Sequence, residues 1–201
     1  VSYGELLDHR RELELRTGVL RRRADWRSPA GQRVRVSTTR IVSLCQRSIA
    51  AIEYVVEVPD EPARVVVQSE LVVNERMSTT RSAVPRVAAS LRAPLRPDLH
   101  AAAGDRAVLV HQVAHSGVRV AAAMDHEVLL DGHDGLTVHS DAQPDLARCT
   151  ITTRLRPGET LRVVKYLAYG WSSARSTPAL RDQVEAALSA AQDTGWAGLL
   201  A

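Results

Sequence analysis

Short strand-like runs separated by turn-forming residues recur along most of this chain. Over residues 32–44, Val34 and Val36 fall on one face of an extended segment and Arg33 and Arg35 on the other. This is the period-two alternation of a half-buried strand. Similar β-branched runs predict strands at 51–58, 64–73, 107–113, 119–123, 127–130, 148–155 and 161–169. Because no helical pattern separates these runs, the sequence predicts a mainly β fold, an antiparallel β-sandwich rather than βαβ units.

The connections between these runs contain residues that favour turns. Proline fixes φ near the value that many turns require, and Gly and Asp tolerate positive φ. Such residues occur at 28–31 (SPAG), 59–62 (PDEP), 116–117 (SG), 131–132 (DG) and 157–158 (PG). Residues 77–104 are different, because they are rich in Ala, Arg and Pro and show no clear period. We expect them to form a long excursion over the sandwich surface that could end in a strand.

Near the end of the chain the period changes to that of a helix. Thr177 is the expected N-cap, Pro178 suits the first helical position and Gly195 suits a left-handed stop. Trp196 would then begin a further element. Apolar residues recur every three or four positions and form one stripe: Leu180, Val184, Leu188 and Ala191. We expect the sandwich and a further domain to cover this stripe together, and the candidates for a domain interface are Leu180, Val184, Leu188 and Trp196.

The composition is typical of a globular protein and does not favour a nucleic-acid partner. Hydrophobic residues make up 45% and charged residues 24% of the 201 residues, and a chain of this length can bury a core without a metal or a disulfide. The net charge is +3, but Lys165 is the only lysine among 26 basic residues and phenylalanine is absent, which indicates a GC-rich genome. Aromatic residues, which stack on single-stranded nucleic acid, amount to 3%. No apolar run approaches the roughly 20 residues of a membrane span, so we expect neither nucleic acid nor membrane as a partner.

The two cysteines, Cys45 and Cys149, lie far apart in the sequence and form no CxxC pattern. One bridge between them is an open alternative, but a secreted disulfide framework usually contains more cysteines. We therefore expect two reduced, buried thiols in a cytoplasmic protein.

Histidines provide the first candidate for a chemical site. His111 and His115 are four residues apart, which places both on one face of a strand. A metal site would need further ligands, and the nearest candidates in the sequence are His126, His133, Asp134 and His139. This spacing matches no standard zinc pattern, so we interpret these histidines as ordinary sheet or loop residues and predict no metal site.

Charged residues provide the remaining candidates. The run Arg21-Arg22-Arg23 could bind phosphate, but on a strand its members alternate between the two faces instead of converging. Two pairs of acids have no spacing that distinguishes them from solvated residues: Glu70 with Glu75, and Asp125 with Glu127. No GxSxG, P-loop or strand-to-helix GxGxxG motif occurs. The residues alone therefore predict no catalytic and no cofactor-binding site.

Specific stretches at both ends of the chain resemble one enzyme family. The first group comprises LELRTGVLRR at 13–22, Trp26, Gly31, VRVS at 34–37, TRIVS at 39–43, AAIEY at 50–54, VQSEL at 67–71 and NE at 74–75. The second group comprises YGWSS at 169–173, PALRD at 178–182 and TGW at 194–196. These stretches resemble the N-terminal domain of glycoside hydrolase family 65. Residues 77–143 match only loosely, and Glu14 stands where the family commonly has Asp.

The resemblance implies a modular enzyme. Family members are α-glucoside phosphorylases for maltose, trehalose, kojibiose or nigerose, or hydrolases such as acid trehalase. They combine an N-terminal β-sandwich of the supersandwich type, a linker, a catalytic (α/α)6 barrel and a small C-terminal sandwich. In their inverting mechanism a glutamic acid of the barrel protonates the leaving oxygen while phosphate or activated water attacks the opposite face. Both the acid and the phosphate site belong to the barrel, so the resemblance places no catalytic residue on this chain.

From this resemblance we expect residues 1–175 to form a β-sandwich domain that lacks the family's opening strands. Residues 176–201 would form a helical linker towards a missing catalytic barrel. The expected role is non-catalytic domain packing in an inverting enzyme that acts on α-linked glucose disaccharides, without a cofactor. The expected partners are the barrel of the same chain and, in the parent enzyme, the disaccharide, phosphate for a phosphorylase, and a second copy if the parent is a homodimer.

A standalone carbohydrate-binding module is the alternative. Sugar rings stack on exposed aromatic side chains, and the chain offers four tyrosines and three tryptophans for this role, the latter being Trp26, Trp171 and Trp196. A gene that continues into a long helical region with an acidic catalytic position would favour the enzyme domain. A stop codon would favour the module.

Overall fold

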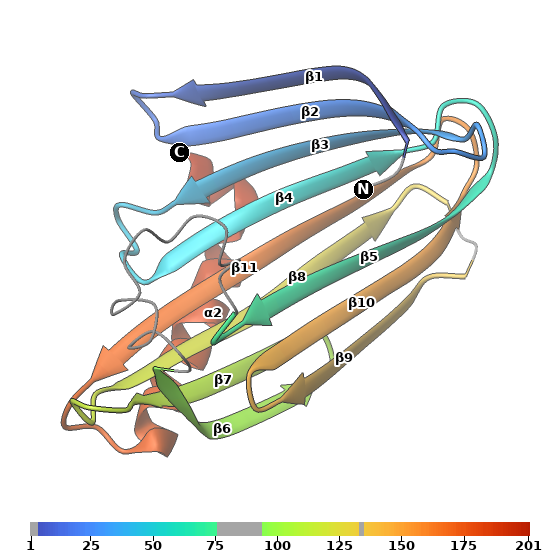
Figure 1. The fold of residues 1–201 in the computed structure, drawn as a ribbon. Helices are drawn as coiled ribbons and strands as arrows, with labels where there is room; N and C mark the ends of the chain where they lie inside the picture. The colour runs from blue at the N-terminus through green and yellow to red at the C-terminus, as the bar shows by residue number, and fades with distance from the viewer. Residues whose placement is uncertain (1–3, 76–93, 133–134) are drawn as a thin grey trace, which may run out of the picture.

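The computed structural model describes residues 4–75, 94–132 and 135–201 (Figure 1). These residues form strands followed by one long helix: β1 (Glu5–Glu14), β2 (Val19–Arg27), β3 (Arg33–Val42), β4 (Ile49–Glu57), β5 (Ala63–Val72), β6 (Leu95–Ala103), β7 (Arg106–Val113), β8 (Arg119–Leu130), β9 (Thr137–Gln143), β10 (Leu146–Leu155), β11 (Thr160–Ser172) and α2 (Thr177–Leu200). His133, Asp134 and most of the expected excursion at 77–104 lie outside the described residues.

Two antiparallel sheets and the helix form three layers. The large sheet has the strand order β1-β2-β3-β4-β11-β8-β7-β6, and the small sheet has the order β5-β10-β9. The small sheet lies in front of the β11 to β6 part of the large sheet, on what we call the inner face, and α2 covers the opposite, outer face (Figure 1). The predicted antiparallel β-sandwich with a C-terminal helix is confirmed.

The predicted strands are present, and further strands occur that were not predicted. Segments 119–123 and 127–130, predicted as two strands, form the single strand β8, which continues through the residues between them. β1, β2 and β9 consist mainly of exposed or half-buried residues, so no apolar alternation predicted them. The expected excursion does end in a strand, β6.

Alternation along the strands builds one apolar core on each face of the large sheet. The core between the two sheets includes these fully buried side chains: Leu109, Met124, Ile151, Leu155 and Leu161. The core on the outer face joins the strands to α2 and includes Val108, Val110, Val164 and Tyr166 of the sheet. The large sheet is therefore the central layer, and α2 is an integral part of the packed structure.

The helix begins one residue earlier than predicted. Ser176, not Thr177, is the N-cap, because its side chain accepts a hydrogen bond from the Ala179 backbone N–H at 3.4 Å. Pro178 is consequently the second helical residue and not the first, and it still lies in the first turn. Gly195 has φ 70° and ψ 167°, which interrupts the helix, and a further helical segment follows it. The predicted break and the predicted element after it are both present.

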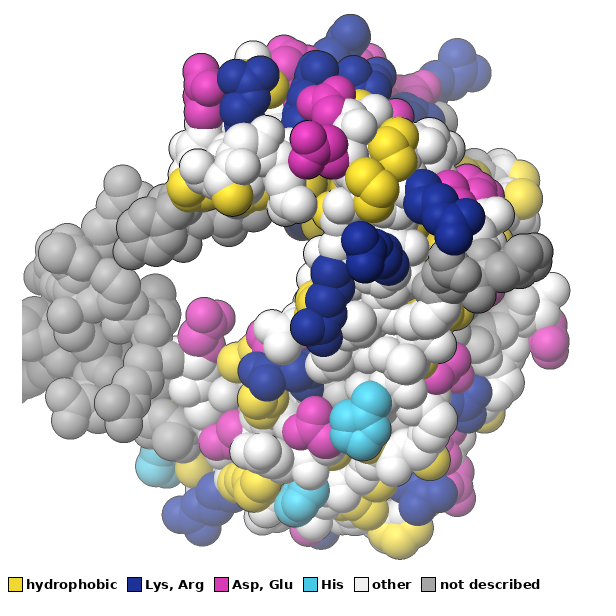
Figure 2. All heavy atoms as spheres, turned by 90° about the vertical axis from the view of Figure 1, so that its right-hand side faces the viewer, with side chains coloured by type: hydrophobic (Ala, Val, Ile, Leu, Met, Phe, Trp, Pro, Cys, Tyr) yellow, Lys and Arg dark blue, Asp and Glu magenta, His cyan; other side chains and the backbone are white. Residues whose placement is uncertain are grey.

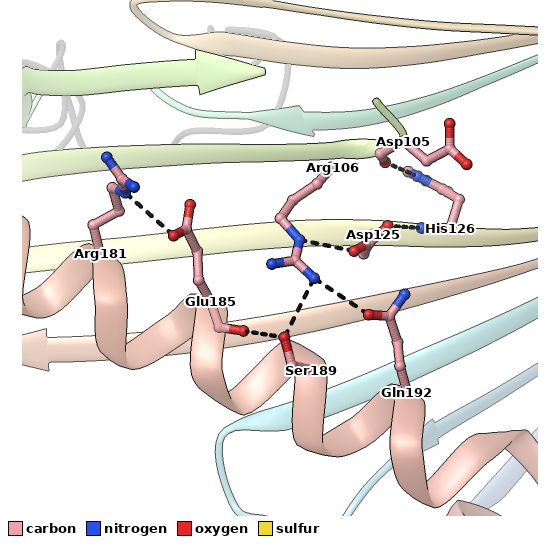
Figure 3. A network of polar contacts seen from close by, with 8 residues as sticks. All are labelled: Asp105, Arg106, Asp125, His126, Arg181, Glu185, Ser189 and Gln192. Atoms are coloured by element: carbon pink, nitrogen blue, oxygen red, sulfur yellow. Dashed lines mark hydrogen bonds and ion pairs between the residues drawn. The ribbon is translucent and has the colours of Figure 1, made fainter. Parts of the chain in front are cut away.

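Polar contacts around Arg106 help to hold α2 against the sheet. Arg106 of β7 donates to Asp125 of β8 at 2.8 Å and reaches Ser189 and Gln192 of α2 at 3.4 and 3.3 Å (Figure 3). Arg181 and Glu185, nearby on the helix, pair with each other at 3.3 Å. Arg106 thus links two strands to the helix through one guanidinium.

Candidate functional site

The inner face of the large sheet is covered only in part. The small sheet packs mainly on β6, β7 and β8, whereas β1 to β4 extend beyond it. Figure 2 shows the open space in front of this uncovered surface, with the β1 side of the large sheet above it and basic side chains at its rim. We call the uncovered inner surface of β1 to β4 the open face.

Cross-strand pairing brings three arginines together on the open face. Arg11 of β1 pairs directly with Arg22 of β2, and Arg22 pairs with Thr38 of β3. Arg40 lies two residues after Thr38, so it points to the same face. Together they form the wall of a hollow of about 330 Å³, which we call the basic hollow and which is lined by His9, Arg11, Leu20, Arg22 and Arg40.

The outer face of the same strands carries arginines with carboxylate partners. Arg21 contacts Glu14 at 3.2 Å. Arg33 and Arg35 both contact Asp25, with Arg33 Nε at 2.8 Å from Oδ1 and Arg35 Nε at 3.2 Å from Oδ2. The hydrogen bond from Arg33, together with Arg35 and against the effect of burial, lowers the pKa of Asp25. The two faces of β1 to β3 therefore differ in charge balance.

Several exposed apolar side chains lie along the end of the large sheet where β1, β3 and β11 end. Trp171 is 75% and Tyr169 48% exposed, on the inner side of β11. Val42 of β3 and Leu13 of β1 are 72% and 53% exposed. We call this surface the apolar edge, and its members are Leu13, Leu15, Val42, Leu44, Tyr169 and Trp171. A second hollow, of about 350 Å³, adjoins it and is lined by Arg47, Ser48, Val120, Tyr169, Gly170, Trp171 and Gln183.

The predicted interface residues of the tail are placed on the outer face. Leu180, Val184 and Leu188 are at most 1% exposed, because they pack on the large sheet. Trp196 is partly buried against the same core. This chain's own sheet thus covers the stripe, and a contact of these four residues with a further domain stays a prediction.

The histidines do not converge. His111 contacts Asp145 at 2.9 Å, whereas His115 is exposed in the turn after β7. His126 is buried on β8 and His139 lies on β9. Among residues 4–75, 94–132 and 135–201 no group of three or more His, Cys, Asp or Glu side chains could hold a metal ion.

The two candidate acid pairs do not form shared sites, in agreement with their interpretation as ordinary residues, although Asp125 is buried rather than solvated. Glu70 binds Arg148 at 2.7 Å, and Glu75 is exposed at the end of the first described segment. Asp125 binds Arg106, while Glu127 accepts a hydrogen bond from the Tyr166 hydroxyl at 3.1 Å. Neither pair forms a shared carboxylate site.

One expectation about the cysteines is wrong. Both thiols are free and Cys149 is buried, as expected, but Cys45 is exposed in the turn between β3 and β4. That turn has polar residues around the cysteine and contributes no side chain to either core.

Two polar groups between the sheets, the partly buried Lys165 and the buried His126, make contacts that were not predicted. Lys165 donates through Nζ to the Glu70 carbonyl at 2.7 Å, and burial lowers its pKa to about 8. His126 contacts the Ser69 hydroxyl at 2.7 Å and the Asp105 carbonyl at 2.8 Å, and burial lowers its pKa as well. Neither residue lines the basic hollow or the second hollow. Both therefore join the two sheets through hydrogen bonds to β5.

In the described part of the chain, no helix combines the length and hydropathy that crossing a membrane requires.

The chain is similar to known proteins along its whole length. Residues 1–201 match the model of the glycosyl hydrolase family 65 N-terminal domain. An uncharacterized glycosyl hydrolase of Mycobacterium tuberculosis (strain H37Rv) is 56% identical over 200 residues, and one of Mycobacterium leprae is 54% identical over 200 residues. These alignments cover 100% of this chain but 25% of each relative. The chain therefore spans about a quarter of the length of these relatives.

The fold also matches a solved structure. A protein described as a kojibiose phosphorylase, from the human microbiome, superposes with a TM-score of 0.79 over 98% of this chain and 24% of its own. Sequence identity is 12%, so this likeness concerns the fold. On the strength of the match over residues 1–201, the chain belongs to the glycosyl hydrolase family 65 N-terminal domain family.

Proposed function

We propose that this chain is the non-catalytic N-terminal domain of an inverting α-glucoside phosphorylase or hydrolase. Its substrates would be glucose disaccharides of the maltose, trehalose or kojibiose type. The observation that carries the proposal is the family match over 201 residues that correspond to 25% of each relative. Inverting hydrolysis in general needs two carboxyl groups facing one substrate, and neither acid pair considered above forms a shared carboxylate site. The chemistry would therefore belong to another part of the enzyme.

The domain's role in this proposal is to pack against the catalytic domain of the same polypeptide through the apolar edge. Trp171 and Tyr169 are aromatic residues of the kind that anchor interfaces when buried. Covering exposed apolar side chains contributes about 25 cal/mol per Å² of area removed from water. Residues 176–201 would then lead from the sandwich into that domain along the outer face.

The packing role can be tested in the complete enzyme that contains this chain. A Val42→Ala/Trp171→Ala variant should lose hydrogen-exchange protection at the end of β11 and be cleaved faster between the domains. Val66→Ala is the matched control, because Val66 is 49% exposed on the small sheet, away from the apolar edge. Equal protection in the double variant and the wild type would contradict the packing role.

The non-catalytic assignment has its own test. Purified residues 1–201 should not turn over maltose, trehalose or kojibiose, with or without phosphate. Turnover above a protein-free blank would contradict the assignment. The two free thiols favour a reducing compartment, and we propose a cytoplasmic enzyme on that ground.

A carbohydrate-binding module is the second candidate, and one observation favours it. Tyr169 and Trp171 are two residues apart on β11, share the inner face and are both exposed. Aromatic faces at this spacing can stack on sugar rings. Calorimetry with maltose and trehalose distinguishes the two candidates. A dissociation constant below about 100 µM, or ~5.5 kcal/mol of binding free energy, that is lost in Trp171→Ala would favour the module.

A further inference from the structure

The arginines of the basic hollow are brought together by strand register, not by sequence. Arg11 and Arg22 are direct cross-strand partners, and Arg40 is a diagonal neighbour of Arg22 because Thr38 is the direct one. Direct partners have Cβ atoms about 5 Å apart and diagonal ones about 7–8 Å, and like charges placed so closely destabilise a sheet. Three adjacent positive charges on one face of the sheet therefore need a compensating negative charge.

No carboxylate on the open face compensates them. By register, the inner positions of β1 to β4 carry these residues: Leu6, His9, Arg11, Leu13, Leu20, Arg22, Ala24, Trp26, Val34, Val36, Thr38, Arg40, Val42, Ala50, Ile52, Tyr54 and Val56. All Asp and Glu residues of these four strands lie on the outer face: Glu5, Asp8, Glu12, Glu14, Asp25, Glu53 and Glu57. The inner positions thus combine three arginines with no acid.

The three guanidiniums also keep most of their hydrogen-bonding capacity. Among the described residues, Arg11 and Arg40 make no hydrogen bond or ion pair, and Arg22 makes one, from Nε to His9 Nε2 at 3.0 Å. Because His9 accepts through Nε2, its ring proton is on Nδ1, which is a further donor. Each guanidinium has five N–H groups, so the hollow is rich in donors.

Two hydroxyl groups adjoin the arginines in the same row of the sheet. Thr38 lies between Arg22 and Tyr54 in register. It is 6% exposed and its Oγ1 has no hydrogen-bond partner within the described residues. Burial raises the pKa of Tyr54, and the charge of Arg22 opposes that shift, which places the Tyr54 hydroxyl within reach of the arginine's field. A buried unpaired hydroxyl beside unpaired cations is costly in the absence of a ligand.

We propose that the basic hollow binds a phosphate group in its doubly charged form, either as inorganic phosphate or as a phosphate monoester. Planar guanidinium forks match the oxygens of phosphate, and charge-assisted hydrogen bonds of this kind are about twice as strong as neutral ones. A dianion bound between Arg11, Arg22 and Arg40 would also offset their mutual repulsion. The site requires no residue from another domain, so it does not depend on the proposed function.

The test follows the Arg Nε–Hε signals of the 201-residue chain by NMR during titration with inorganic phosphate, at about pH 8, where the dianion dominates. Chloride keeps the ionic strength constant. Saturable shifts are expected at Arg11, Arg22 and Arg40. In Arg40→Gln the dissociation constant should rise roughly tenfold, as for a lost charge-assisted hydrogen bond. Arg11→Gln, on the edge strand, is the second variant if the first disturbs the amide spectrum.

Arg23→Gln is the matched control, because Arg23 neighbours Arg22 on β2 but points to the outer face. It should leave the titration unchanged. A second titration with glucose 1-phosphate distinguishes a phosphate monoester from inorganic phosphate. The ligand with the lower dissociation constant is the form that the hollow prefers. Three results would overturn the proposal. These are linear shifts without saturation, an equal loss in Arg23→Gln, and binding of succinate as tight as that of phosphate.

Discussion

Gly170 of β11 lies directly beneath Val184 of α2, so closely that a Cβ on the glycine would be 2.9 Å from the valine Cγ1. Leu180 Cδ1 would be 3.3 Å from the same Cβ. Contacts below about 3 Å between carbon atoms are repulsive, since their optimum is 3.5–4.0 Å. The absence of a side chain at this position therefore lets the helix approach the sheet, and the outer core depends on it.

Gly170→Ala should destabilise the domain by about 1–3 kcal/mol, the usual cost of overpacking a tight core. The free energy of unfolding in urea measures this change. Gly198→Ala is the control: its added Cβ would also come to 2.9 Å from a side chain, but from Cγ2 of the exposed Thr194, which can move into solvent, whereas Val184 is buried. Alanine at this position also favours a helix. Equal midpoints for Gly170→Ala and the wild type would show that α2 can shift without loss.

Removing Arg106 should loosen α2 and leave the buried Asp125 carboxylate without its main partner. Asp125 is 7% exposed, and an unpaired buried charge of this kind costs about 3–5 kcal/mol, less where water can enter. We expect Arg106→Ala to lower the free energy of unfolding by about 2–4 kcal/mol. Arg181→Ala, which breaks the partly exposed pair with Glu185, should cost under about 0.5 kcal/mol. Similar losses in the two variants would contradict the role given to Arg106.

Truncating a buried side chain of the apolar stripe on α2 should destabilise the sandwich itself. Leu188 is fully buried against the large sheet. A buried Leu→Ala change typically costs about 2–5 kcal/mol. Leu188→Ala should therefore lower the urea midpoint of residues 1–201 without any other domain present. Leu44→Ala, at a side chain 87% exposed, is the control and should change little. An effect confined to the complete enzyme would instead mark Leu188 as an interface residue.

The architecture was predictable because its central strands follow a period of two. β3, β5 and β11 contain runs rich in β-branched residues, so each of them was predicted from the sequence. β1 is different: only Leu6, Leu7 and Leu13 are apolar in it, and most of its side chains are exposed. Such a strand is defined by its pairing with β2 rather than by a pattern of its own. For the same reason the sequence did not predict that β1 places His9 and Arg11 on the open face.

The basic hollow could not be predicted from the linear sequence. The basic candidate in the sequence was the run Arg21-Arg22-Arg23. Its members alternate between the two faces of the sheet, as expected. Convergence occurs instead between Arg22, Arg11 and Arg40, which come from three strands. Their proximity depends on the pairing register, and a shift of one residue would place each arginine on the opposite face. Only the three-dimensional structure supplies that register.

The pH dependence of stability should reveal Lys165. Burial, opposed by the nearby Cys149 and Glu70, lowers the pKa of Lys165 from 10.5 to about 8 in the folded chain. Between these values the unfolded chain binds more protons than the folded one, so the free energy of unfolding rises with pH. Burial also raises the pKa of Cys149 above 9.0, so stability from that thiol begins to fall as the pH approaches 9.0, and only a variant that keeps Cys149 separates the two effects. We expect Lys165 to contribute a gain of about 1 kcal/mol between pH 8 and 9, close to the limit of 1.36 kcal/mol per unit. Urea unfolding at both pH values measures it, and Lys165→Met, which has no charge to bury, should lack the gain. Parallel curves for the two proteins would mean that the folded lysine keeps an ordinary pKa and that its position between the sheets is solvated.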